Sequence, residues 1–161
     1  MRKAVFIIAI LCLLSCNKPA TDHASTVQTI GIEQFDELKD ANIGKVLVLN
    51  VFASWCPPCE EETPSFVQMY DKYAANAKFE LIGLSIDESK AELEAFLQKH
   101  KVNYPIYQIT PAIQRRLMAN KVPTTIIYAP NGMYQTSILG AVDGEELYQF
   151  VETLAPSSAL E

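Results

Sequence analysis

The sequence predicts an α/β domain with a mixed central sheet flanked by helices. Strand-like apolar segments alternate along the chain with segments whose apolar residues recur every three or four positions, as in helices that cover a sheet. The last two strand-like segments are joined by Pro130-Asn131-Gly132, a turn sequence that favours an antiparallel hairpin. About 145 residues follow the apolar N-terminus, which is enough for one domain with a single core.

The first two strands are expected at Thr29–Ile32, as a short edge strand, and at Val46–Ala53. A small helix through Phe35 and Leu38 separates them and stops near Gly44. Because Val46–Ala53 is apolar on both alternations, it is expected in the centre of the sheet with both faces covered.

The helix after this strand is expected to bury one apolar stripe, formed by Phe66, Met69, Tyr70 and Tyr73. Pro64, inside the same pattern, predicts a kink. A second buried strand is expected at Phe79–Ile86. Ser89 with Glu92 then forms a capping-box pattern that opens the next helix. The inward residues of that helix are expected to be Leu93, Phe96 and Leu97.

The C-terminal part of the chain completes the sheet and adds two helices. Its next elements are expected to be a short strand at Pro105–Tyr107, a helix over 112–119, and strands at Thr124–Tyr128 and Met133–Leu139. Asp143 with Glu146 is expected to cap the last helix. The inward residues of this helix are expected to be Leu147, Phe150, Val151 and Leu154.

A pair of cysteines directly follows the central strand, in the sequence Trp55-Cys56-Pro57-Pro58-Cys59. A helix that starts here points its unpaired backbone N–H groups at the first sulfur and favours its thiolate, the form that attacks a disulfide. Pro57 and Pro58 suit a first helical turn, because they have fixed φ and no N–H to lose. The spacing and its position between strand and helix predict a dithiol/disulfide redox couple.

The N-terminus has the features of an export signal. Arg2 and Lys3 form a basic start, and Ala4–Leu14 is apolar but shorter than the about 20 residues of a membrane-spanning helix. The run ends in Leu13-Leu14-Ser15-Cys16, which resembles a bacterial lipoprotein signal. The resemblance implies cleavage before Cys16 and a lipid anchor on the periplasmic side of a bacterial membrane. An ordinary cleaved signal and an uncleaved anchor are the alternatives.

Under this interpretation residues 1–15 are a signal peptide, and residues 16–28 are the lipidated cysteine and a polar tether. Cys12 leaves with the signal, so Cys56 and Cys59 are the only free thiols of the mature chain. That chain has 11 basic and 19 acidic residues, a net charge of −8, and no basic cluster. This charge excludes nucleic acid and anionic lipid surfaces as expected partners.

Neither a structural disulfide nor a metal site explains the cysteine pair well. An exported compartment is oxidising, but a disulfide that spans two residues closes almost no loop and stabilises the fold little. A zinc site needs about four ligands, of which Cys56 and Cys59 supply two. His23 and His100 are expected to be surface residues, so no metal site is predicted.

At this point the chain resembles the thioredoxin superfamily, most closely its extracytoplasmic, membrane-anchored TlpA/ResA-like branch. The resemblance covers roughly residues 29–154, within a predicted domain at 29–156 and before a tail at 157–161. Its motifs are the cysteine motif, Pro64, Val122-Pro123-Thr124-Thr125 before a strand, and the helix and short strand between residues 89 and 107. It implies a thioredoxin-like fold with a central helix-strand insertion.

The resemblance also implies roles for individual residues. Cys56 would be the nucleophile and Cys59 the resolving thiol, and their disulfide would be the only redox group, without a further cofactor. Pro123 would match the family's cis-proline, where Val122 pairs with a substrate strand. With Pro57 and Pro58, these residues would form the substrate-binding surface. Trp55 would offer an amphipathic face to the substrate; a Trp that is simply packed is the alternative.

Asn50 departs from thioredoxin, which has a buried aspartate at that position as a proton acceptor. The TlpA/ResA-like branch carries a glutamate three residues after the second cysteine, and here it is Glu62. Residues three apart share a helix face, so Glu62 is the hypothetical proton acceptor for Cys59. The alternative is that Glu60, Glu61 and Glu62 are solvated acids that favour a helix N-terminus, which is the preferred interpretation for the first two.

These features together predict an extracytoplasmic thiol-disulfide oxidoreductase that acts on protein disulfides. Three acids beside the cysteines, with no Lys, Arg or His among the adjoining residues, favour a reductase fed by a membrane electron donor. In the resembling family such proteins often reduce the haem-binding cysteines of cytochrome c, which is one candidate role. The alternative is a redox-inactive binding protein or a copper chaperone of the Sco type, although that family has three residues between its cysteines.

Overall fold

The computed structural model describes residues 27–155 of the chain. The elements are β1 (Gln28–Ile30), α1 (Ile32–Asp40), β2 (Val46–Phe52), α2 (Pro57–Tyr73), β3 (Phe79–Ser85), α3 (Lys90–His100), β4 (Ile106–Ile109), α4 (Pro111–Arg116), β5 (Thr124–Tyr128), β6 (Tyr134–Leu139) and α5 (Gly144–Leu154).

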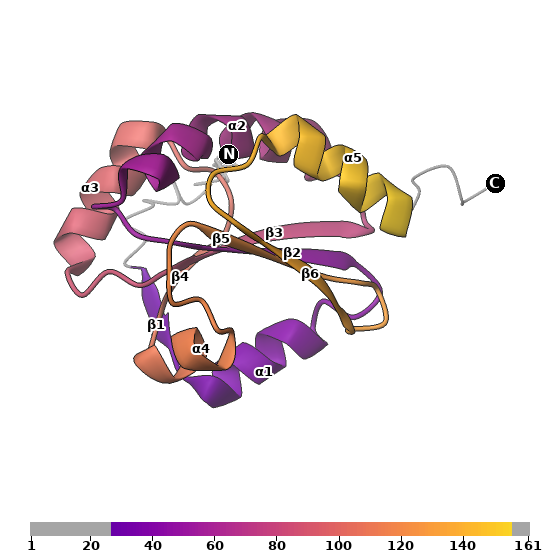
Figure 1. The fold of residues 1–161 in the computed structure, drawn as a ribbon, viewed down its shortest axis with the longest axis horizontal. Helices are drawn as coiled ribbons and strands as arrows, with labels where there is room; N and C mark the ends of the chain where they lie inside the picture. Colours follow the sequence, from indigo (N-terminus) through magenta and orange to yellow (C-terminus); the bar gives the residue numbers. More distant parts are fainter. Residues whose placement is uncertain (1–26, 156–161) are drawn as a thin grey trace, which may run out of the picture.

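These elements form a six-stranded sheet between two layers of helices (Figure 1). The strand order is β1-β4-β3-β2-β5-β6, in which the first four strands are parallel and β5 and β6 are antiparallel to their neighbours. Helices α2, α3 and α5 cover one face of the sheet, and α1 and α4 cover the other. The predicted mixed α/β architecture is confirmed.

Strand β2 lies in the middle of the sheet, and all seven of its residues are buried. Leu47, Leu49 and Val51 belong to the core cluster on the side of α1 and α4. Val46 and Val48 belong to the cluster beneath α2 and α5. Successive side chains of a strand point to opposite faces, so a strand that is apolar on both alternations needs cover on both. The sequence-based assignment of a central strand is confirmed.

Some element boundaries differ from the expectation. Helix α4 ends at Arg116 instead of residue 119, because Met118 has a φ of 53° and leaves the helical conformation. Strand β1 begins at Gln28, and Val27 before it is buried, so the last residues of the predicted tether belong to the domain. Helix α2 continues across Pro64, and the kink stays a prediction. The predicted signal peptide, Cys16 and the tail at 157–161 lie outside the described residues.

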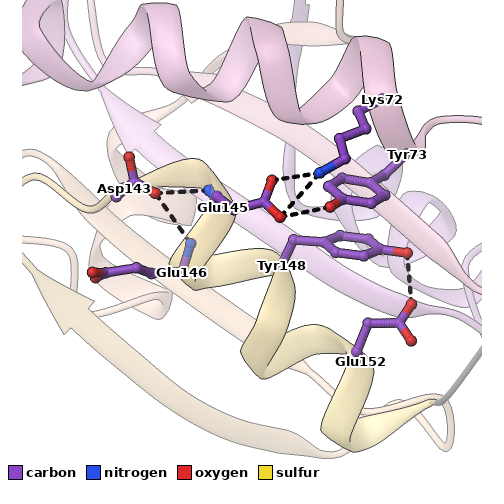
Figure 2. Close-up of polar contacts among 7 residues, drawn as sticks. All are labelled: Lys72, Tyr73, Asp143, Glu145, Glu146, Tyr148 and Glu152. Atoms are coloured by element: carbon purple, nitrogen blue, oxygen red, sulfur yellow. Dashed lines mark hydrogen bonds and ion pairs between the residues drawn. The ribbon is translucent and has the colours of Figure 1, made fainter.

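Two helix N-termini carry the expected caps. The Ser89 hydroxyl accepts a hydrogen bond from the backbone N–H of Glu92, 3.3 Å away, at the start of α3. The Asp143 carboxylate accepts from the backbone N–H groups of Glu145 and Glu146 at 2.9 and 3.1 Å, at the start of α5 (Figure 2). These bonds satisfy donors that have no partner within the helix, so both helices start where the sequence predicts.

The inward face of α5 differs from the prediction at one aromatic residue. Phe150 is 39% exposed, whereas Tyr148 is buried and stacks on Tyr73 of α2 with ring centroids 3.3 Å apart. Figure 2 shows the two rings side by side, with Glu145 accepting hydrogen bonds from Lys72 and from the Tyr73 hydroxyl. Tyr148 and Phe150 flank the same apolar stripe on opposite sides, and only the Tyr148 side faces α2.

The difference in burial between Tyr148 and Phe150 predicts that their replacement by alanine affects stability unequally. Tyr148→Ala should lower the free energy of unfolding by about 3 kcal/mol, because it removes a buried ring and its stacking contact. Phe150→Ala, on the same helix, should cost less than about 1 kcal/mol, because its ring is already partly solvated. Urea unfolding of both variants measures the difference. Equal losses would contradict the inward placement of Tyr148.

Candidate active site: a cysteine pair at the start of helix α2

The cysteine motif occupies the transition from β2 to α2. Cys56 is the N-cap residue of α2, with extended backbone angles, and Pro57 and Pro58 fill the first two helical positions. The backbone N–H of Glu60 donates to the Cys56 carbonyl at 3.1 Å and closes the first turn. A helix N-terminus carries a partial positive charge, so this position favours a thiolate at Cys56.

Cys56 and Cys59 form a disulfide with a Cα–Cα distance of 5.3 Å. Cys56 is 5% exposed and Cys59 is fully buried, so the first sulfur is the one that a partner can reach. Trp55, the residue before Cys56, is 63% exposed. The alternative of a simply packed Trp is therefore wrong, and the exposure agrees with an amphipathic face open to a partner.

The loop before β5 closes the site from the other side. The Val122–Pro123 peptide bond is cis, as the family resemblance implied. The Cys56 sulfur lies 3.6 Å from the Val122 carbonyl oxygen. In the disulfide this sulfur carries no hydrogen, and in the reduced protein its thiol can donate to that oxygen. The Pro123 carbonyl accepts a hydrogen bond from the backbone N–H of Gly140 at 2.9 Å, which ties the loop to the end of β6.

Glu62 lies on the same side of α2 as Cys59 and is only 4% exposed. Its Oε1 accepts a hydrogen bond from the Asn50 side chain at 2.8 Å, and its Oε2 accepts from the backbone N–H of Val142 at 3.1 Å. The Asn50 amide also donates to the Thr125 hydroxyl at 3.3 Å. The interpretation of Glu62 as a solvated acid is therefore wrong, because it is buried and bound by groups from two distant segments of the chain.

Burial controls the acidity of this group. Removal from water raises the pKa of Glu62 to about 7, while the hydrogen bonds from Asn50 and Val142 act in the opposite direction. Burial also raises the pKa of Tyr104, and the charge of Glu62 contributes to that rise. A carboxyl group with a pKa near neutrality can both take up and release a proton under ordinary conditions.

The two acids before Glu62 behave differently. Glu61 is exposed. Glu60 forms an ion pair with Lys99, which holds the pKa of its carboxyl below the usual value, and lies 3.3 Å from the His100 Nε2 atom. The sequence places no Lys, Arg or His among the residues that adjoin these acids, but the fold does, because α3 brings Lys99 and His100 to the first turn of α2.

His100 is not the surface residue that the sequence suggested. Its side chain is 12% exposed, and its ring packs against Phe96 with centroids 4.5 Å apart.

Within residues 27–155, no group of three or more His, Cys, Asp or Glu side chains has an arrangement that could hold a metal ion. No helix in the same part of the chain is long and apolar enough to cross a membrane.

Known proteins with a similar sequence or fold are disulfide oxidoreductases, in agreement with this cysteine site. The model of a family described as thioredoxin-like matches residues 44–134. The chain belongs to this thioredoxin-like family. It is 25% identical over 114 residues to thiol-disulfide oxidoreductase ResA of Oceanobacillus iheyensis, covering 70% of this chain but only 59% of that protein. It is 28% identical over 121 residues to ResA of Bacillus cereus, covering 74% of this chain and 69% of that protein.

A solved structure of similar kind is that of a secreted disulfide oxidoreductase of Mycobacterium tuberculosis, described as homologous to DsbE. It is 25% identical, has a TM-score of 0.62, and the match covers 71% of this chain and 86% of that one. The M. tuberculosis protein thus shares the fold, and all three similar proteins are named as disulfide oxidoreductases.

The buried Glu62 carboxyl predicts a pH dependence of stability. Its folded-state pKa of about 7 lies above the ordinary value of 4.5, so its contribution is fully present below pH 4.5 and is lost as the pH rises to 7. The oxidised protein should therefore lose on the order of 3 kcal/mol of unfolding free energy over this interval. Glu62→Gln should lack that loss, whereas Glu61→Gln, at an exposed site, should keep it. Urea unfolding at pH 4.5 and pH 7.5 measures the change, and identical pH profiles for wild type and Glu62→Gln would contradict the assignment.

Proposed function

We propose that the protein is an extracytoplasmic thiol-disulfide oxidoreductase that reduces protein disulfides through Cys56 and Cys59. The observation that carries the proposal is the position of the pair, with the reachable Cys56 at a helix N-terminus and its sulfur beside the Val122 carbonyl. Membership of a thioredoxin-like family and similarity to ResA proteins support the same chemistry.

In the first step the Cys56 thiolate attacks one sulfur of a substrate disulfide. A bond forms between Cys56 and that sulfur, the substrate S–S bond breaks, and the leaving substrate thiolate takes a proton. The exposed Trp55 ring and the loop at Val122 and Pro123 flank the sulfur, and together they form the surface on which the substrate segment lies.

In the second step Cys59 resolves the mixed disulfide. Glu62 takes the proton of the Cys59 thiol, and the resulting thiolate attacks the Cys56 sulfur. The Cys56–Cys59 disulfide forms and the second substrate thiol leaves, so that two electrons have passed to the substrate. The buried carboxyl of Glu62 suits this role because its pKa of about 7 lies close to the pH at which the thiol must lose its proton.

The direction of electron transfer follows from the same charges. A carboxylate beside the cysteines disfavours their thiolates, which stabilises the disulfide and makes the dithiol a reductant. Because Lys99 pairs with Glu60 and Glu61 is exposed, the buried Glu62 contributes more to this effect than the other two acids. We therefore assign the protein as a reductase rather than an oxidase of disulfides.

The proposed location is extracytoplasmic, on the periplasmic side of a bacterial membrane. The lipoprotein-like sequence before Cys16 supports a lipid anchor, and the similar M. tuberculosis protein is described as secreted. A protein that reduces disulfides there must be reduced again, so a membrane electron donor is its expected partner. The haem-binding cysteines of cytochrome c are one candidate substrate, as the resemblance to the TlpA/ResA-like branch implies.

Insulin reduction tests the proposed chemistry. The reduced protein should accelerate insulin precipitation, Cys56→Ser should abolish the activity, and Cys59→Ser should accumulate a mixed disulfide, because its nucleophile remains but cannot be released. Absence of activity in the wild-type protein would favour a redox-inactive binding protein instead.

Equilibration with glutathione tests the direction. A reductase should have a reduction potential below roughly −200 mV, and a value near about −120 mV would indicate an oxidant. Glu62→Gln should make the potential less negative, because it removes the carboxylate that disfavours the thiolates.

A further inference from the structure

Asp87 is a buried acid just after β3 that takes no part in the reaction described above. It is 3% exposed, and both of its carboxylate oxygens accept hydrogen bonds. The backbone N–H of Ser54 lies 3.0 Å from each oxygen, and the Ser54 hydroxyl donates to Oδ1 at 2.6 Å. The Ser85 hydroxyl donates to Oδ2 at 2.7 Å. Every partner is a donor, which is the arrangement that a carboxylate requires.

The position of Asp87 is itself fixed by neighbouring strands. Its backbone N–H donates to the Ser85 hydroxyl at 3.0 Å, and its carbonyl accepts from the Gln108 side chain of β4 at 2.6 Å. Gln108 in turn accepts from the Thr29 hydroxyl of β1 at 2.6 Å. Hydrogen bonds from β3 and β4, backed by one from β1, therefore hold Asp87 before any substrate arrives.

Ser54, the residue that Asp87 holds, connects the end of β2 to the cysteine motif. It directly precedes Trp55, and the backbone N–H of Cys56 donates to the Ala53 carbonyl at 3.2 Å across it. The path of the chain into α2 thus turns around a residue whose backbone and side chain are both bound to Asp87.

We propose that Asp87 is a positioning residue of the active site, which holds Ser54 and thereby fixes Trp55 and Cys56 at the start of α2. The proposal rests on the proposed thiol-disulfide function, and it gives Asp87 a second, electrostatic role at Cys56. The carboxylate places a negative charge against Ser54, in the segment that leads into Cys56. Two residues span at most about 7 Å, so the charge lies within about 12 Å of the Cys56 Cα atom. A charge at that distance, poorly screened by water, disfavours the Cys56 thiolate.

Two substitutions separate the effects of charge and of position. Asp87→Asn removes the charge and nearly keeps the shape, with its NH2 group now donating to one of the two serine hydroxyls, so the Cys56 pKa should fall by roughly 0.5. Ser54→Ala keeps the charge and removes the 2.6 Å hydrogen bond, so insulin reduction should slow by about tenfold through misplacement of Cys56. Glu80→Gln is the matched control, since Glu80 lies near the opposite end of β3 and pairs with Lys45.

The readouts are the pH dependence of Cys56 alkylation in the reduced protein, the rate of insulin reduction and the thermal unfolding midpoint. A shifted Cys56 pKa in Asp87→Asn and a slowed rate in Ser54→Ala, with both unchanged in Glu80→Gln, support the proposal. A lowered unfolding midpoint with unchanged pKa and rate in both variants overturns it, because Asp87 would then only stabilise the fold.

If Asp87→Asn fails to fold, Ser54→Ala and Ser85→Ala decide, since each removes a single donor to the carboxylate. Unchanged insulin-reduction rates in both serine variants would then overturn the proposal. Failure of the proposed function is a separate result, because it appears as lack of insulin reduction by the wild-type protein, whereas the Cys56 pKa is measured without any substrate.

Discussion

The hydrogen bond between Asn50 and Glu62 joins the central strand to the helix that carries the cysteines. Asn50 is 2% exposed on β2 and Glu62 is 4% exposed on α2, so neither group has water as a substitute partner. Loss of one partner from such a pair costs about 1–3 kcal/mol, because the other is left buried and unsatisfied. The bond therefore constrains how α2 lies against β2, and with it the position of Cys59, one helical turn from Glu62.

Tertiary contacts decide which charged groups near the cysteine pair are buried and which are paired at the surface. The N-terminus of α2 favours a thiolate at Cys56, whereas the carboxylates of Glu62 and Asp87 oppose it from buried positions. Glu60, the acid next to Cys59 in sequence, is paired with Lys99 at the surface and is therefore largely offset. Buried groups are less screened than exposed ones, so Glu62 and Asp87 have a larger influence on the cysteines than the partly exposed Glu60.

The fold was largely predictable, because strand burial and helix caps are local properties of the chain. The apolar segment from Val46 predicted the central strand, and Asp143 predicted the start of α5. The errors arose where a choice between neighbouring residues depended on a distant partner. On the inward face of α5 the buried aromatic residue is Tyr148 and not the predicted Phe150, because Tyr73 lies on that side. His100 is enclosed because its ring packs on Phe96 and its Nε2 atom lies near Glu60.

The sequence by itself determined the reacting groups. Two cysteines at the end of a buried strand and the start of a helix specify the dithiol, and the family resemblance implied that the loop at Val122 and Pro123 faces it. The tertiary structure decided how the supporting groups act, because burial of a charge depends on atoms far away in the chain. Glu62 is enclosed by Asn50, 12 residues away, and by Val142, 80 residues away. Asp87 holds Ser54 across 33 residues, a contact that no local pattern in the sequence predicts.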